Sequence, residues 1–234
     1  MHSTYNPVYR PSELHESFLT GDFLELMAKK SPDYPYERIG LDRFIAILID
    51  MQEANILPPA TLLDIGSNTG FFSQLFALSG YTVTAIDNEA APQVQGHYPC
   101  SLRAIAESQN TELHLETIQF CWTDARKWIA QTQQNHVVSL LLSVVHQWFN
   151  GYAGSDSEKT PKKDILTFLE NVIRKTEKII YFETPVRHIN GLDCGLDLVA
   201  WFTQQPLVKS INNVSHSLDA DGEFREIYRI QLHT

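Results

Sequence analysis

Hydrophobic positions along this 234-residue chain change their spacing repeatedly, from short apolar or β-branched runs to the three-to-four-residue spacing of amphipathic helices. The short runs predict strands at Thr61–Ile65, Tyr81–Ile86, Leu113–Cys121, Val137–Val145, Lys178–Glu183, Val208–Ser217 and Glu226–His233. The wider spacing predicts helices from Leu41 to the Pro58-Pro59 pair and at Gly70–Ser79, Leu102–Gln109, Trp122–Gln131, Lys162–Lys175 and Leu196–Phe202. Strands and helices therefore alternate through most of the chain.

This alternation predicts an α/β fold, namely a doubly wound, mainly parallel seven-stranded sheet with helices on both faces. The last two strands are close enough in sequence to pair as a C-terminal antiparallel hairpin. Residues 1–40 are rich in proline and tyrosine and predict an N-terminal segment that acts as a substrate lid. Attachment of this segment to the sheet edge by its tyrosines is the alternative. Residues 41–234 are expected to form the single α/β domain.

The charge balance argues against a broad nucleic-acid-binding surface. The chain has 18 Lys and Arg against 28 Asp and Glu, a formal net charge of −10, whereas proteins that hold phosphate backbones present basic faces. The three cysteines form no CxxC pair, and no spacing of His or Cys indicates a metal site. With no leader-like N-terminus and no apolar run of membrane-spanning length, the sequence predicts a cytoplasmic protein with reduced thiols and no membrane partner.

The stretch Leu62–Ser73 contains the most informative chemistry. An apolar strand reaches Asp64, and a turn bounded by Gly66 and Gly70 then leads into a helix. Such a turn lets a ligand approach backbone N–H groups without obstructing side chains. A carboxylate at Asp64 repels a pyrophosphate and attracts a ligand with a cationic group. A strand-to-helix turn that binds nothing is the alternative.

Three motifs together resemble those of the class I S-adenosylmethionine-dependent methyltransferases, over residues 60–234. Asp64-x-Gly66-x-x-x-Gly70 is similar to the family's glycine-rich first motif, although Asn68 stands where the family usually has a middle glycine. Asp87 closes the second strand, where a carboxylate can accept hydrogen bonds from both ribose hydroxyls. Thr123-Asp124-Ala125 resembles the family's Asp-Ala step, in which the Asp accepts a hydrogen bond from the adenine amino group.

The resemblance implies a Rossmann-like methyltransferase fold, with residues 41–234 as the methyltransferase domain and S-adenosyl-L-methionine as the cofactor. It implies that the cofactor is bound by Asp64, Gly66, Asn68, Gly70, Phe71, Asp87, Asn88, Asp124, Ala125 and Ser143. The acidic residues agree with a cofactor that carries an ammonium and a sulfonium group. Phe71 stands where the dinucleotide fingerprint has glycine, which disfavours an NAD(P) oxidoreductase. For Asp124 taken alone, capping of the following helix is the alternative.

His146 is the candidate general base. It follows the fourth predicted strand, where residues of the resembled family face the methyl group and the acceptor, and an imidazole can accept a proton near neutral pH. A structural role, in packing or in a hydrogen bond to a loop carbonyl, is the alternative. Glu183 ends the fifth strand and could bind a cationic acceptor or orient His146. The favoured interpretation is that it caps nearby N–H groups or pairs with a neighbour such as Arg187.

These features favour methyl transfer to an oxygen or nitrogen of a small-molecule acceptor. A methyltransferase that acts on RNA or protein is one alternative, and a non-catalytic binding protein that keeps the fold is another. The sequence identifies neither the acceptor, nor the atom that is methylated, nor the oligomeric state.

Overall fold

The computed structural model describes residues 35–67, 71–87, 115–119, 122–150, 160–185, 194–218 and 224–233. The helix expected at Leu102–Gln109 lies outside these residues, and so do residues 1–34 of the expected lid. Helix α2 (Pro35–Glu53) begins six residues before the expected domain boundary and continues across it without a break.

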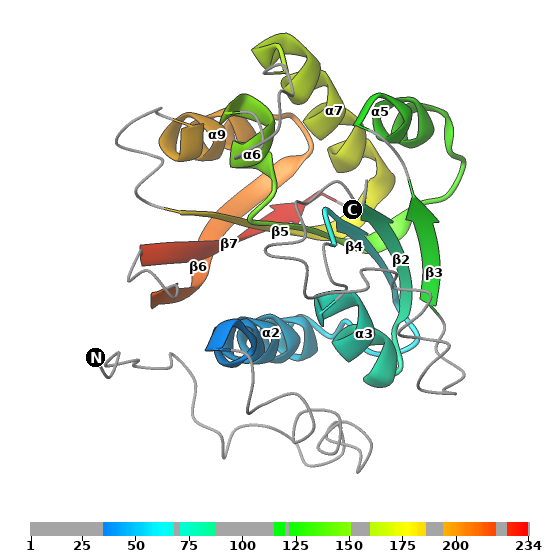
Figure 1. The fold of residues 1–234 in the computed structure, drawn as a ribbon, viewed down its shortest axis with the longest axis vertical. Coiled ribbons are helices and arrows are strands. Elements are labelled where there is room, and N and C mark those ends of the chain that lie inside the picture. The colour runs from blue at the N-terminus through cyan, green and yellow to red at the C-terminus, as the bar shows by residue number, and fades with distance from the viewer. Residues whose placement is uncertain are drawn as a thin grey trace.

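Seven strands form one sheet, in the order β3-β2-β1-β4-β5-β7-β6 (Figure 1). They are β1 (Thr61–Ile65), β2 (Thr82–Asp87), β3 (Leu115–Gln119), β4 (His136–Leu142), β5 (Thr176–Pro185), β6 (Val208–Leu218) and β7 (Phe224–Leu232). Strands β1 to β5 pair in parallel, whereas β7 is antiparallel to both β5 and β6. The prediction of a doubly wound sheet with a C-terminal hairpin is confirmed. The strand order reverses between β1 and β4, and ligands of such sheets bind beyond the carboxyl ends of the strands at this point.

Helices cover both faces of the sheet, and each face forms an apolar core. The helices α2 and α3 lie on one face, and α5, α6, α7 and α9 lie on the other (Figure 1). Beyond α2, their bounds are α3 (Phe71–Leu78), α5 (Trp122–Gln131), α6 (Val145–Asn150), α7 (Lys162–Lys175) and α9 (Cys194–Thr203). Leu62 and Phe76 belong to the first core, whereas Leu63 and Phe168 belong to the second, because side chains alternate along a strand.

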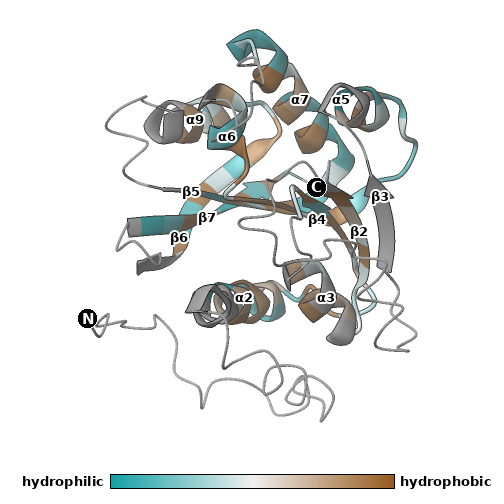
Figure 2. Ribbon diagram, viewed as in Figure 1, coloured by the Kyte–Doolittle hydropathy of each residue, from teal (hydrophilic) through white to brown (hydrophobic). Residues whose placement is uncertain are grey.

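The distribution of hydropathy follows this layering. Figure 2 shows hydrophobic colour along the central strands and hydrophilic colour on the outer turns of α7. On α7 the apolar residues recur at helical spacing and are buried, namely Ile165, Phe168, Leu169, Val172 and Ile173. Among the helices that the structure describes, none is both long and apolar enough to cross a membrane.

Polar contacts fix α2 to the sheet in addition to its apolar face. The Tyr181 hydroxyl on β5 donates to Asp50 Oδ2 over 2.5 Å, and Arg229 Nη1 on β7 lies 3.1 Å from Asp50 Oδ1. Burial and the Asp50 carboxylate raise the pKa of Tyr181, so its hydroxyl stays protonated and continues to donate. This contact holds α2 against β5 and β7 and thereby positions Arg43, two helical turns earlier.

The structure shortens the strand predicted over Val137–Val145 and adds a helix after it. The observed bounds of β1 and α7 are the predicted ones, but the strand expected over Val137–Val145 ends at Leu142, and the short helix α6 begins at Val145. The strand ends because Ser143 adopts a φ of 56°, in the left-handed region. The sequence prediction was wrong here because an apolar run does not distinguish a buried strand from the buried first turn of a following helix.

His136 should make the fold sensitive to acid. Its side chain is fully buried at the start of β4, its ring nitrogens have no hydrogen-bond partner among the described residues, and burial lowers its pKa to about 4. The unfolded chain, with a His pKa near 6.5, binds the proton first as the pH falls. The free energy of unfolding is therefore undiminished above about pH 6.5. It falls by about 3 kcal/mol in total as the pH drops toward 4.

The variant His136→Leu should lose this part of the acid sensitivity. We expect urea titrations at pH 7 and at pH 4.5 to give a smaller difference in unfolding free energy for the variant than for the native chain, by about 2 kcal/mol. Equal pH dependence in the two proteins would show that the imidazole is not held neutral by burial.

Candidate functional site

The turn after β1 requires glycine at its first position. Gly66 has a φ of +75°, and a Cβ placed on it would lie 2.4 Å from Val144 Cγ2, closer than real atoms approach. The N–H groups of Gly66 and Ser67 both donate to the carbonyl of Ile86, at 2.8 and 3.2 Å. The turn therefore packs against the carboxyl end of β2 on one side. On the other side it packs against Val144, two positions after the end of β4.

Asp64 is a buried carboxylate at this turn. It is 3% exposed on β1, and Ser73 Oγ on α3 donates to its Oδ2 over 2.5 Å. The neighbouring residues Leu63 and Ile65 belong to the core on the opposite face, so Asp64 points toward α2 and α3. A buried carboxylate keeps its charge only where nearby groups compensate for its lost hydration. A cationic ligand would provide such compensation, so the Asp64 carboxylate is a suitable counter-ion for a cation.

Ser67 adds a polar atom that the sequence analysis did not select. Its side chain is 7% exposed, and its Oγ has no hydrogen-bond partner among the described residues. A buried hydroxyl without a partner costs free energy unless a ligand or water satisfies it. The sequence could have indicated Ser67 by its position, because it directly follows Gly66 in a turn where backbone N–H groups meet a ligand.

Some of the other predicted cofactor residues lie within the described part of the chain, and others lie outside it. Asp87 is the last residue of β2 and pairs with Gln119, so its backbone lies at the same sheet edge as the glycine turn. Asp124 lies in the first turn of α5. Ala125 is buried and belongs to the same apolar cluster as Ile86. Phe71 begins α3. Three further predicted residues, Asn68, Gly70 and Asn88, lie outside the described residues.

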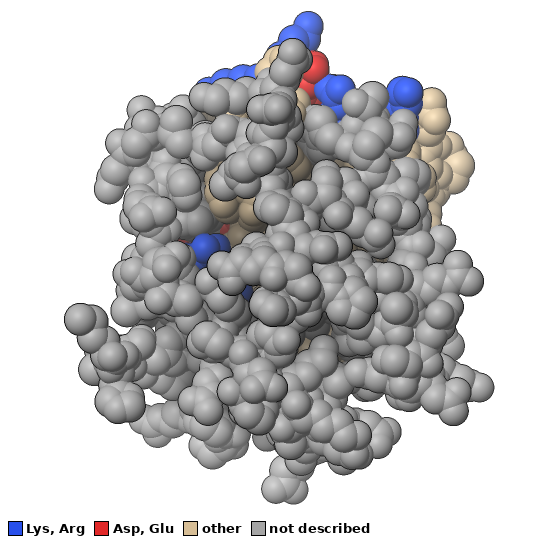
Figure 3. Space-filling view, in the orientation of Figure 1, with Lys and Arg blue, Asp and Glu red and all other residues tan. Residues whose placement is uncertain are grey.

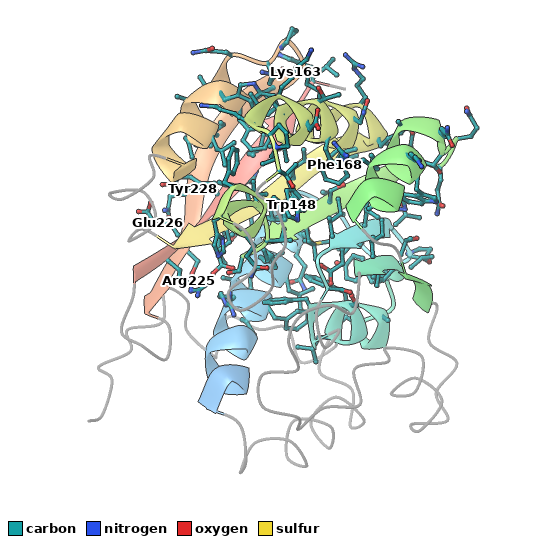
Figure 4. The ribbon with its side chains drawn as sticks, turned by 45° about the horizontal axis from the view of Figure 1, so that its top comes forward. Trp148, Lys163, Phe168, Arg225, Glu226 and Tyr228 are labelled. Carbon is teal, nitrogen blue, oxygen red and sulfur yellow. The ribbon has the colours of Figure 1, made fainter. Side chains whose placement is uncertain are left out.

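His146 lies in the first turn of α6 rather than at a strand end, and its side chain is 8% exposed. Contacts to α7 and to Thr160 hold α6, the helix that carries His146, in place. Trp148 packs edge-on against Phe168 of α7, with ring centroids 5.2 Å apart (Figure 4). The backbone carbonyl of Trp148 also accepts from the N–H of Thr160. The position of His146 relative to the strand ends is thus fixed by packing, and its role as a base stays a prediction.

A charged cluster occupies the adjacent strand ends. Glu183 on β5 is fully buried, and Arg43 Nη1 on α2 lies 2.7 Å from both of its carboxylate oxygens. Ser143 Oγ donates to Glu183 Oε2 over 2.9 Å, and Arg225 on β7 donates to Ser143 Oγ. Arg225 Nη1 also lies 4.0 Å from Glu183 Oε1. We call these four residues the arginine cluster.

The expected pairing of Glu183 with Arg187 lies outside the described residues, and the described partners of Glu183 are the other members of the cluster. Its arginines are far from Glu183 in sequence, 140 positions in the case of Arg43, so no local pattern indicated them. Figure 4 shows Arg225 at the start of β7, beside α2. In the space-filling view, basic and acidic atoms lie together in a hollow between α6 and α2 (Figure 3). Nowhere in the described ranges do three metal-ligating side chains converge.

The strand order, the glycine turn and the antiparallel terminal hairpin define the class I methyltransferase fold. No family model matches the chain, and no curated protein matches its sequence. Among solved structures it is similar to magnesium protoporphyrin IX methyltransferase (ChlM) from Synechocystis PCC 6803 with bound S-adenosylhomocysteine, with a TM-score of 0.56 and 10% identity. That alignment covers 93% of this chain and 97% of the other.

Two further structures extend the comparison. The N-methyltransferase NodS from Bradyrhizobium japonicum WM9 aligns with a TM-score of 0.57 and 13% identity, over 86% of this chain and 99% of its own. WbdD aligns with a TM-score of 0.57 and 18% identity, over 88% of this chain and 42% of its own. At such identities the similarity is one of fold.

Proposed function

We propose that this protein transfers a methyl group from S-adenosyl-L-methionine to an oxygen or nitrogen of a small-molecule acceptor. The observation that carries the proposal is the buried Asp64 carboxylate beside a closed glycine turn, in a methyltransferase fold. A buried negative charge at that point favours a ligand with cationic groups and disfavours the pyrophosphate of a dinucleotide.

The described residues fit this cofactor. Asp64 supplies negative charge for the ammonium and sulfonium groups, and the unsatisfied Ser67 hydroxyl supplies a hydrogen-bonding group in the same turn. The absence of a Cβ at Gly66 lets Val144 close the site from the side of β4. By the resemblance, Asp87 would accept from the ribose and Asp124 from the adenine, and both occupy element ends on this edge of the sheet.

When bound, the cofactor supplies a methyl group on a positively charged sulfur, which is a good leaving group. Held beside Asp64, Gly66 and Ser67, it would supply this methyl group to a lone pair on the acceptor, and its sulfur would leave as a neutral thioether. The protein's part is to align the two reactants and to exclude water. A neutral hydroxyl or ammonium acceptor must also lose a proton, and His146 is the candidate to accept it.

The proposal is tested by label transfer. The purified protein is incubated with methyl-deuterated S-adenosylmethionine and with separate small-molecule, RNA and protein fractions of a cell extract. We expect mass spectrometry to find the label in a small molecule, together with stoichiometric S-adenosylhomocysteine. Label in RNA or protein would replace the small-molecule acceptor by a macromolecular one. Binding of the cofactor without any transfer would identify a non-catalytic protein.

A further inference from the structure

We infer that Ser73 is a positioning residue for the cofactor, because its hydroxyl holds the Asp64 carboxylate in the orientation in which it binds the cationic part of S-adenosylmethionine. This inference rests on the proposed function, since Ser73 acts on the same site through Asp64. It starts from a contact inside the protein, the hydrogen bond that Ser73 Oγ on α3 donates to Asp64 Oδ2 on β1 over 2.5 Å.

The Ser73 hydroxyl differs from other helical hydroxyls of the described chain in the direction of its bond. A hydroxyl on a helix commonly donates to the carbonyl four residues earlier. Thr167 on α7, Thr203 on α9 and Ser79 just after α3 all do so, at 2.9, 2.9 and 2.8 Å. Ser73 instead donates to a side chain on a strand, nine positions away in sequence. Its hydroxyl is therefore directed at the site and not at the helix that carries it.

Burial makes the orientation of the carboxylate depend on this hydroxyl. Ser73 is fully buried and Asp64 is 3% exposed, so bulk water does not readily take the place of the serine. The torsion that turns a carboxylate of aspartate is broad and has no sharp preference of its own. A hydrogen bond to an ionised acceptor is strong where little water competes. The bond from Ser73 therefore fixes the direction in which the negative charge of Asp64 faces the site.

The donor is itself held in place at the start of α3. Ser73 is the third residue of this helix, and the ring of Phe72 before it lies under the Arg43 guanidinium of α2, with the Arg43 Cζ 5.4 Å from the ring centroid. Leu75 and Phe76, on the following turn, are buried in the core that includes residues of α2. A carboxylate that is oriented before its ligand arrives loses less entropy on binding. Ser73 therefore contributes to affinity by preorganisation.

A positioning role and a merely structural role give different results in a double-mutant comparison. A serine that only ties α3 to β1 contributes to stability, and its removal changes affinity by the same factor whatever the charge of Asp64. A serine that acts through Asp64 affects affinity only while Asp64 carries the charge that is to be oriented. Asp64→Asn keeps the shape and an acceptor oxygen but removes that charge, so the two single variants and the double variant separate the two roles.

Ser73→Ala should weaken the binding of S-adenosylmethionine about tenfold when Asp64 is present, the usual effect of losing a hydrogen bond to a charged group. In the Asp64→Asn background the same change should weaken binding by less than about threefold. Isothermal titration of the native chain, both single variants and the double variant gives the four affinities. Equal factors in the two backgrounds, or an affinity of Ser73→Ala within about twofold of the native value, would overturn the inference.

Ser73→Cys takes the place of the alanine variant in this comparison if Ser73→Ala does not fold. A thiol is close to a hydroxyl in size but is a weaker donor. We expect binding to weaken about threefold to tenfold beside Asp64 and by less than about twofold in the Asp64→Asn background. Equal factors in the two backgrounds would overturn the inference here as well.

Ser139→Ala is the matched control. Ser139 on β4 is also a fully buried serine with a hydrogen bond to a side chain, with 2.6 Å between its Oγ and Thr176 Oγ1. Thr176 is the first residue of β5, so this bond lies toward the amino end of that parallel strand, away from the glycine turn. The change should lower the free energy of unfolding and leave the affinity for S-adenosylmethionine within about twofold of the native value.

The failure of this inference differs from the failure of the proposed function. A native protein that does not bind S-adenosylmethionine would refute the proposed function. A native protein that binds it, together with a Ser73→Ala variant that binds it equally well, would overturn the inference alone. Equal losses of affinity in Ser73→Ala and Ser139→Ala would also overturn it, because they would reflect stability and not position.

Discussion

Replacing Gly66 with alanine is expected to destabilise the fold by about 2 to 4 kcal/mol and to abolish binding of S-adenosylmethionine. Two effects add at this position. A φ of +75° disfavours any residue with a Cβ, and the new methyl carbon would lie 2.4 Å from Val144 Cγ2 and 2.8 Å from Val144 Cβ. Relief of the clash must move either the glycine turn or the residue that precedes α6, and both border the proposed site. Denaturant unfolding and calorimetry measure the two effects.

Gly80→Ala is the control for a substitution at a positive φ away from the site. Gly80 also has a positive φ, of +89°, but it follows α3 at the end of the sheet away from the site, and its added Cβ would lie 3.2 Å from Pro58 Cβ. We expect a loss of about 1 to 2 kcal/mol in stability and unchanged affinity for S-adenosylhomocysteine. If Gly66→Ala binds the cofactor as the native protein does, the turn is not part of the cofactor site.

Asp64→Asn is expected to lower the affinity for S-adenosylmethionine about tenfold to a hundredfold, the usual effect of removing one charge-assisted contact. Asparagine has nearly the same shape, and its side-chain oxygen can still accept the hydrogen bond from Ser73. The variant therefore removes negative charge from a site that is 3% exposed and leaves its packing in place. Isothermal titration of the native and variant proteins gives the ratio of affinities.

Asp50→Asn provides the matched control for Asp64→Asn. Asp50 is also a mostly buried carboxylate, but it lies on α2 and its contacts are to Tyr181 and Arg229. The change should lower stability, because it weakens both contacts, and should leave cofactor affinity within about twofold of the native value. Equal losses of affinity in the two variants would mean that total acidity, and not the position of Asp64, determines binding.

Much of the fold follows from the sequence because its strands and helices differ in hydrophobic period. β1 and α7 have the predicted bounds, and the antiparallel pairing of β6 with β7 followed from their closeness in sequence. The end of β4 did not follow, since Val144 and Val145 continue the apolar run into α6. The left-handed backbone at Ser143 that separates the two elements has no sequence signature as strong as glycine.

The candidate site could be predicted from the sequence only where its residues lie in local motifs. Asp64 and Gly66 belong to one turn, so their spacing was informative. The described arginine partners of Glu183 come from α2 and β7, which only the folded sheet brings beside β5. A strand-end glutamate therefore had several possible partners in the sequence and has specific ones in the structure. Capping or pairing of Glu183 was the favoured interpretation, and the structure pairs it with Arg43 and Arg225.

The central claim is that the glycine turn beside Asp64 selects a cationic cofactor. Titration calorimetry of the native chain with S-adenosylmethionine, S-adenosylhomocysteine and NAD measures this selection directly. We expect saturable binding of the first two ligands, with mutual competition, and no binding of NAD. Binding of NAD at the same site, or no binding of either sulfur compound, would contradict it.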